Sequence, residues 1–236
     1  MLGISTSSRD LRDLGMTLEA LPPAHAISGV VRGARDFLRP EAMADALLNP
    51  LDRAFTVPTL NAWLERCGMV FGRWVEQAPY LPHCGIVAKS PHATRLAALP
   101  EPAQHAAVEL FRGTMMSHNV ITYRDDRAAP SQPITFEDHR WRSFVPIPVP
   151  WTTRIRERLP RGSAAVLLNR AHAFPDLVLP ITPFEASLLD AVDGERTLAE
   201  ILYSEGRYNV GEHDVLSFFE RLWRYDQIVF DASGSV

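Results

Sequence analysis

Apolar residues recur at helical spacing near the start of the chain and predict a helix within residues 8–21. Its buried face would consist of Leu11, Leu14, Leu18 and Leu21. The proline pair at 22–23 ends this helix, because proline lacks a backbone donor. A second helix is expected near residues 41–48. Thr56 can cap a third helix, and Gly68 can end it.

The next segment mixes helices with strands. Apolar and polar residues alternate over residues 69–75 and predict a strand, and residues 118–124 predict another. Ser90 followed by Pro91 is a typical helix start, with serine as the cap and proline in the first turn. A further helix is expected over residues 100–112. Its inward face would be Ala103, Ala106, Ala107, Leu110 and Phe111.

The last third of the chain begins with two short predicted strands, residues 164–169 and 176–180. Thr182 and Glu185 then form a capping-box pattern with a proline at the first helical position. The buried face of this helix would be Phe184, Leu188, Leu189 and Val192. A hairpin therefore leads into a helix.

Two more helices and a strand complete the chain. Thr197 and Glu200 repeat the capping-box pattern and predict a short helix. A longer helix is expected over residues 212–225 and a strand over residues 227–231. The buried face of the longer helix would be Val215, Leu216, Phe219, Leu222 and Trp223. A hairpin, three helices and a strand follow one another in a winged-helix-like order.

A polar, turn-rich stretch at residues 125–133 is the candidate domain boundary. Beyond it, prolines occupy alternate positions of residues 145–150, which indicates an edge strand or an extended linker. The predicted division is a mixed helical and strand block over residues 1–124, a proline-rich connector with an edge strand over residues 125–162, and a winged-helix-like domain over residues 163–236. The expected fold class is α+β.

Composition is ordinary for a globular protein, with 46% apolar and 22% charged residues among 236. No run of apolar residues is long enough to span a membrane, and no secretory signal pattern opens the chain. Two cysteines do not suggest a disulfide framework. We therefore expect a cytoplasmic protein without a membrane partner. Its single lysine among 24 basic residues is typical of a GC-rich bacterial genome.

Glycine spacing argues against a nucleotide site. The 13 glycines are never closer than four positions apart, so the chain contains no G-x-G. Loops that cradle a pyrophosphate or an adenosine ribose usually need closely spaced glycines. Lys89, the single lysine, follows no glycine loop either. We expect no cofactor-binding residues in this chain.

Metal and hydrolytic motifs are also missing. The chain has no C-x-x-C, no H-E-x-x-H and no G-x-S-x-G. Cys67 and the adjacent pair His83 and Cys84 fall short of a four-ligand set. Residues 137–139, a Glu-Asp-His run, offer acid–base chemistry, but a solvated loop is the better interpretation. No catalytic residue and no metal ligand is assigned from the sequence.

Charge excludes the usual partner of a winged helix. Residues 182–236 hold eleven acidic and four basic residues, a net charge of −7, while the rest of the chain carries +3. Proteins that bind DNA need cations to displace the counterions of the phosphates. Nucleic acid is therefore not an expected partner.

Two stretches of the sequence have a distinctive pattern. The first reads N-P-L-D-R-A-F-T-V-P over residues 49–58 and continues through Trp63-Leu64, Cys67-Gly68 and Trp74 to residues 77–82, with residues 108–115 in the same pattern. The second runs from residues 179–182 to residues 193–201. Both stretches resemble a group of bacterial class I S-adenosylmethionine-dependent methyltransferases. The second is also similar to small winged-helix peptide binders such as the peptide chaperone of pyrroloquinoline-quinone biosynthesis.

The resemblance implies the C-terminal half of such an enzyme, a regulatory region followed by a winged-helix module. The Rossmann-like catalytic domain would lie upstream of Met1, so no catalytic residue is carried over. S-adenosylmethionine is the cofactor expected for the full-length family and not for this chain. The chain would then be a fragment, or an adaptor beside a separate enzyme, and whether it is itself an enzyme stays open.

Three functions follow from these observations. The first is a non-catalytic substrate-recognition or regulatory portion of a methyltransferase, with a catalytic domain or a peptide or protein substrate as partner. The alternatives are a peptide-binding adaptor that adds a strand at residues 227–231, and a methyltransferase with an atypical cofactor site. Loop residues beside a strand end indicate where a substrate or partner site would lie. These are Arg53, Trp74, Tyr80, His83 and Cys84. Ordinary aromatic packing is the alternative interpretation of the same residues.

Overall fold

The structure is a computed structural model that describes residues 3–25, 27–33, 38–126, 134–205 and 211–234. The chain divides into two compact units, Met1–Phe55 and Thr56–Val236. The fold is α+β, as the sequence predicts, with helices and small antiparallel sheets. Among the described residues, no helix combines the length and the apolar composition needed to traverse a lipid bilayer.

The first unit is helical, with α1 (Ser8–Glu19), α2 (Ser28–Gly33) and α3 (Pro40–Leu48). The helices expected within residues 8–21 and near residues 41–48 are confirmed, whereas α2 was not expected. The core of this unit consists of Leu11, Leu18, Val31 and Met43.

The second unit begins with α4 (Val57–Arg66), which Thr56 caps as predicted. Gly68 follows the helix with a φ of 66°, a left-handed conformation that favours glycine. The predicted strands are confirmed as β1 (Met69–Trp74) and β2 (Val120–Arg124), which pair antiparallel. A Cβ at Gly72 would lie 2.5 Å from a ring carbon of Tyr123, so only glycine fits where the register shifts.

Helices connect the two strands of this sheet. They are η1 (Ala78–Tyr80), η2 (Val87–Lys89), α5 (Ala93–Ala97) and α6 (Glu101–Arg112). The predicted helix start at Ser90 and Pro91 is wrong, because α5 begins at Ala93 after His92. Ser90 instead ends η2 in an extended conformation.

The inward face predicted for α6 is also wrong. Its buried residues are His105 and Val108. Leu110 is 79% exposed and Phe111 is 46% exposed. Alanines such as Ala103, Ala106 and Ala107 occur on both the buried and the exposed face of helices. The predicted inward face of α6 was therefore decided by its two large apolar residues, Leu110 and Phe111. The helix instead turns a histidine toward Trp74 and Tyr80.

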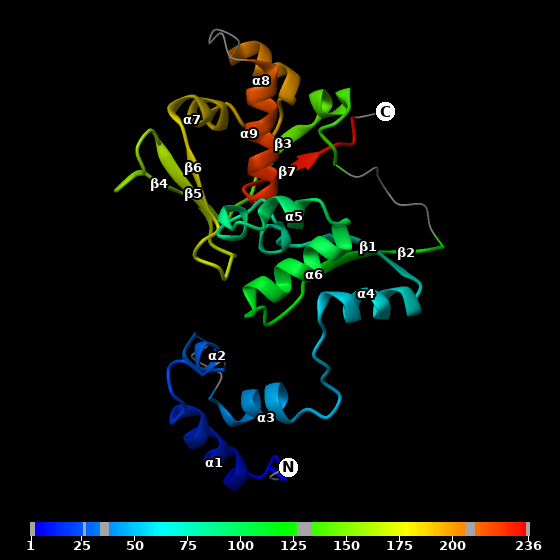
Figure 1. Cartoon of the computed structure of the whole chain (residues 1–236), viewed down its shortest axis with the longest axis vertical. Coiled ribbons are helices and arrows are strands. Elements are labelled where there is room, and N and C mark those ends of the chain that lie inside the picture. The colour runs from blue at the N-terminus through cyan, green and yellow to red at the C-terminus, as the bar shows by residue number, and fades with distance from the viewer. Residues whose placement is uncertain (1–2, 26, 34–37, 127–133, 206–210, 235–236) are drawn as a thin grey trace. The chain divides into compact units, whose positions relative to one another are not determined.

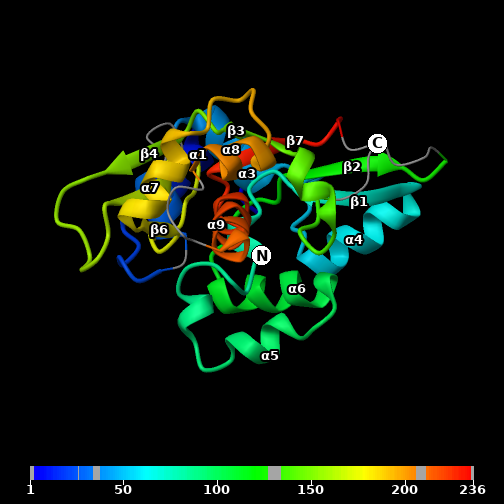
Figure 2. The same cartoon turned by 90° about the horizontal axis from the view of Figure 1, so that it is seen from above.

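In the rest of the second unit, the described residues form a short helix, five strands and three longer helices. They are η3 (His139–Ser143), β3 (Val145–Pro148), β4 (Thr152–Ile155), β5 (Ala165–Asn169), β6 (Val178–Ile181), α7 (Pro183–Asp190), α8 (Leu198–Glu205), α9 (Glu212–Arg224) and β7 (Ile228–Asp231). The strands form an antiparallel β4-β5-β6 sheet and a β3-β7 pair. Figures 1 and 2 show α9 between these two sheets.

The expectations for this part agree closely with the structure. Both capping boxes form: Thr182 with Glu185, and Thr197 with Glu200. The proline-alternating segment is a strand of a two-stranded sheet, with β7 as its described neighbour. Most of the predicted apolar faces of α7 and α9 enter one core, which also includes Trp141, Phe144 and strand residues of β5 and β6. The structure adds β4, which was not expected.

Candidate functional site

A pocket of about 190 Å³ lies within the second unit. Three segments that are far apart in sequence line it: residues 76–80 after β1, residues 114–119 before β2, and residues 171–174 between β5 and β6. The polar residues of its wall are Glu76, Tyr80, Thr114, Ser117, Asn119 and His172. Two buried hydrogen-bond networks hold this wall in place.

The first network centres on Asp226, which is 6% exposed and follows α9 with a φ of 52°. Its carboxylate accepts hydrogen bonds from the backbone N–H groups of Gln77 (3.2 Å) and Ala78 (2.8 Å). The Asp226 carbonyl accepts a further bond from Asn169 Nδ2 at 2.7 Å. Asp226 therefore ties the start of η1 to the C-terminal end of α9 and to β5.

His172 completes this network and reaches the pocket. Its Nε2 lies 3.0 Å from Asp226 Oδ2, and its side chain is 2% exposed. An ionised carboxylate only accepts hydrogen bonds, so Nε2 carries a proton, and Nδ1 is an acceptor when the ring is neutral. Nδ1 is buried and has no hydrogen-bond partner among the described residues. Buried polar atoms rarely lack a partner, and His172 lines the pocket.

The second network ends at Tyr80. The Tyr80 hydroxyl lies 2.8 Å from His118 Nδ1, and His118 Nε2 lies 3.2 Å from Glu109 Oε1. Glu109 also accepts the N–H of Val57, at the positive N-terminal end of α4, at 2.8 Å. When the ring is neutral and Nε2 donates to the carboxylate, Nδ1 accepts a hydrogen bond from the Tyr80 hydroxyl. Burial raises the pKa of the Tyr80 phenol, and the negative charges of Glu109 and Glu76 raise it further.

Trp74 packs against this network from the side of β1. Its ring is stacked on Tyr80, with centroids 3.9 Å apart and planes 8° from parallel. Phe71 and His105 contact Trp74 edge-on or tilted. Stacked and edge-to-face aromatic pairs stabilise each other beyond the area that they bury. The Tyr80 ring is thereby fixed at the pocket wall.

An ion pair between Arg112 and Asp176 supports the pocket wall at Pro79 and Phe174. Arg112 is 2% exposed and lies 3.2 Å from Asp176, and its Nε donates to the carbonyl of Pro79 at 2.7 Å. The Arg112 guanidinium also lies over the Phe174 ring at 4.5 Å. Burial acts to raise the pKa of Asp176, but the N–H of Ile86 and the Arg112 charge outweigh it and the pKa is lowered. Arg112 thus joins α6 to two segments of the wall.

The five residues selected from the sequence have different surroundings. Trp74 is buried in the stack, and Tyr80 lines the pocket. Cys84 is fully buried, its thiol donates to the carbonyl of Arg224, and burial raises its pKa, which makes it a poor nucleophile. His83 is exposed beside it. Arg53 is exposed and belongs to the first unit.

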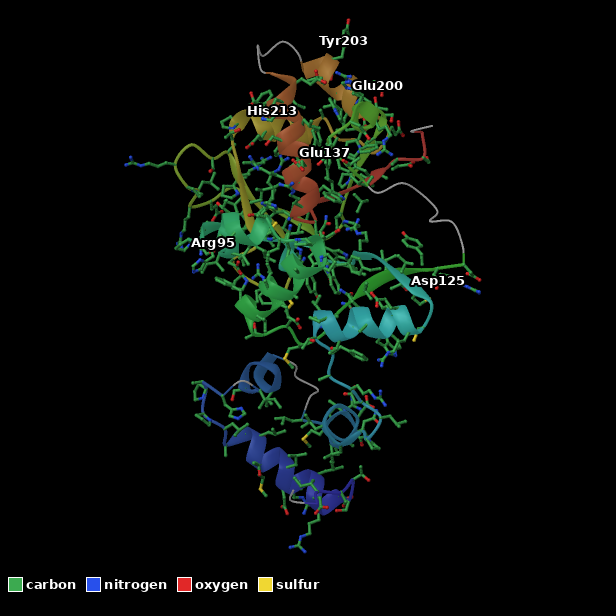
Figure 3. All side chains as sticks on the ribbon, turned by 45° about the vertical axis from the view of Figure 1, so that its right-hand side comes forward. Arg95, Asp125, Glu137, Glu200, Tyr203 and His213 are labelled. Atoms are coloured by element: carbon green, nitrogen blue, oxygen red, sulfur yellow. The ribbon has the colours of Figure 1, made fainter. Side chains whose placement is uncertain are left out.

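Other candidate groups lie apart from the pocket. Asp138 caps η3 and pairs with Arg140, while Glu137 is exposed at the surface (Figure 3). Cys67 ends α4 and is exposed. Across the described ranges, no three His, Cys, Asp or Glu side chains gather as a metal site would require.

Sequence reasoning missed the titratable residues that build the two networks around Tyr80 and the pocket: Glu109, His118, His172 and Asp226. Each belongs to a pair that folding brings together from 9 to 149 positions away, as in Glu109 with His118 and Asp226 with Gln77. No motif spacing marks such pairs. The one local signal is an aspartate directly after a helix, because aspartate tolerates the left-handed conformation seen at Asp226.

Comparison with protein families gives no assignment, since no family model matches the chain. The function is therefore inferred from the pocket and from the sequence patterns.

Proposed function

We propose that this chain is a substrate-recognition or regulatory portion of an S-adenosylmethionine-dependent methyltransferase, and that the pocket is its substrate site. The observation that carries the proposal is where the residues that form and support the pocket wall lie in the sequence. Residues 77–80 fall within the first stretch that resembles these methyltransferases. His172 and Asp226 lie outside the second stretch, residues 179–201, but belong to the predicted winged-helix-like domain that contains it, residues 163–236. The pocket and its supporting network thus combine residues of the first stretch with residues of that domain.

The size of the pocket supports substrate recognition over cofactor binding. Its volume is about 190 Å³. Clefts that enclose drug-sized ligands measure roughly 300–1,000 Å³. A methyl acceptor of a few heavy atoms, or one side chain of a larger acceptor, fits such a space better than a whole adenosyl group does. The lack of closely spaced glycines in the sequence leads to the same expectation.

Isothermal titration calorimetry with S-adenosylmethionine tests the proposal on the whole chain. We expect no measurable heat of binding, and the same sample should be folded by circular dichroism. Micromolar binding would overturn the proposal and favour a methyltransferase with an atypical cofactor site.

A positive test uses photocrosslinking. The chain is used to capture its partner from the source organism, and the complex is irradiated with methyl-labelled S-adenosylmethionine. We expect the label on the partner protein and not on this chain. Label on this chain, or a complex without any labelled protein, would contradict the division of roles.

A further inference from the structure

The polar atoms that the pocket offers are mainly hydrogen-bond acceptors. His172, which lines the pocket, donates from Nε2 to Asp226, so its buried Nδ1, which has no partner among the described residues, is an acceptor when the ring is neutral. When the Tyr80 hydroxyl donates its hydrogen bond to Nδ1 of a neutral His118, its oxygen is left to accept a hydrogen bond from a ligand. A ligand that satisfies both groups must bring N–H or O–H donors.

Glu76 adds a negative charge to the same wall. It is part-buried and lines the pocket, and none of the described basic residues forms an ion pair with it. The nearby cations are engaged elsewhere: Arg112 pairs with Asp176, and Arg73 lies 3.8 Å from Asp226. The negative charge of Glu76 contributes to the raised pKa of the Tyr80 phenol. A cationic donor is therefore favoured over a neutral or anionic one.

The remaining wall is apolar and accommodates the body of a small ligand. Phe174 and Pro79 are held by Arg112, whereas Met115 and Met116 come from the segment before β2. Methionine side chains adapt to the shape of a ligand. Met116 is 70% exposed, which places one side of the pocket at the surface.

From these features we propose that the pocket binds a small organic amine, with the ammonium group against Glu76 and His172 Nδ1 and the carbon body against Met115, Met116 and Phe174. This inference rests on the proposed function in one respect, that the amine would be the methyl acceptor or the part of it that is recognised. The binding itself needs neither the partner nor the methyl donor.

Three probes of nearly the same shape but different charge show whether the charge of a ligand determines its affinity for the pocket: benzylamine, benzyl alcohol and benzoate. Each is titrated into the full chain and followed by ¹H–¹⁵N chemical shifts and by saturation-transfer difference spectra. We expect benzylamine to shift the amides of residues 76–80, 114–119 and 171–174, and to bind about tenfold more tightly than benzyl alcohol. Benzoate should not bind. Added salt should weaken benzylamine binding and leave benzyl alcohol unchanged.

A matched pair of variants locates the charge. Glu76→Gln should bring the affinity for benzylamine down to that for benzyl alcohol, and it should not alter benzyl alcohol binding. Glu65→Gln removes the same charge from an exposed position on α4 and should leave both affinities unchanged. The chemical shifts away from the pocket report whether each variant keeps its fold.

Several results would overturn the inference. They are equal affinity for benzylamine and benzyl alcohol, tighter binding of benzoate, an unchanged benzylamine affinity in Glu76→Gln, or no binding of any probe. None of these depends on S-adenosylmethionine, so the amine site can fail while the calorimetric test of the proposed function succeeds. Binding of S-adenosylmethionine to the chain would reject the proposed function and leave the amine titrations valid.

Discussion

Two buried regions of the second unit are built in different ways. The apolar core is formed by α7, α8, α9 and their strands, and its fully buried side chains include Leu188, Phe219 and Leu222. The polar junction consists of the buried residues Gln77, Asn169 and Asp226 and the buried side chain of His172, joined by hydrogen bonds. Both exclude water, yet one is held by contact area and the other by paired charges and donors.

The contrast shows how function can be separated from stability within one unit. Apolar contacts are non-directional, so the core tolerates conservative changes as long as its volume is kept. The polar junction depends on direction, because each donor must meet its acceptor. That is why the junction can hold the His172 ring at a fixed point of the pocket wall, and the core cannot.

The largest effect should come from emptying the apolar core. Phe219→Ala removes a fully buried ring and should lower the free energy of unfolding by about 3–5 kcal/mol in a urea titration. Phe111→Ala makes the same chemical change on α6, where Phe111 is 46% exposed. We expect less than about 1 kcal/mol there. Equal losses would mean that the predicted inward face of α6 is correct after all.

A smaller effect is expected from the polar junction. Asp226→Asn keeps the shape and tolerates the left-handed φ, but it turns an amide N–H₂ toward donors. It should cost roughly 2–3 kcal/mol in a urea titration, since hydrogen bonds to a charged group are lost in a buried place. The matched control is Asp190→Asn, which breaks an exposed pair with Arg154. That change should cost at most about 1 kcal/mol.

If Asp190→Asn cost as much as Asp226→Asn, the junction would have no special role in holding η1. The same two variants also bear on the site. Asp226→Asn should weaken benzylamine binding, because His172 loses the partner that fixes its tautomer. Asp190→Asn should not change it.

The sequence predicted what depends on local pattern. The capping boxes at Thr182 and Thr197 were found because cap and partner are three residues apart. The apolar faces of α7 and α9 were found because large residues mark one side of each helix. The face of α6 was missed because its large apolar residues, Leu110 and Phe111, lie at the exposed side.

Of the candidate site, Tyr80 and Trp74 were selected in advance because aromatic residues near a strand end often line pockets. His172 and Asp226 were not selected. An isolated histidine and an isolated aspartate carry no spacing signal, and their 54-residue separation gains meaning only when the chain is folded. The periodicity of apolar residues in the sequence gives no indication of the long-range polar pairs in this site.

The smallest expected effect concerns pH and tests the corrected face of α6. His105 is 4% exposed, and burial lowers its pKa to about 4 from a usual value near 6.5. Glu101 lies 3.9 Å away, but it is 72% exposed, so water weakens its attraction and burial dominates. In the unfolded chain His105 takes up a proton below about pH 6.5, while in the folded chain it stays neutral until about pH 4. The unfolded state therefore binds more protons in this window, and stability falls as the pH falls.

Between pH 6.5 and 4.5 we expect a loss of about 2 kcal/mol in the free energy of unfolding from His105. In urea titrations at several pH values, His105→Leu should remove that part of the slope, whereas His213→Leu, on the exposed side of α9 (Figure 3), should retain it. An unchanged slope in His105→Leu would place His105 in water and return Leu110 and Phe111 to the inward face.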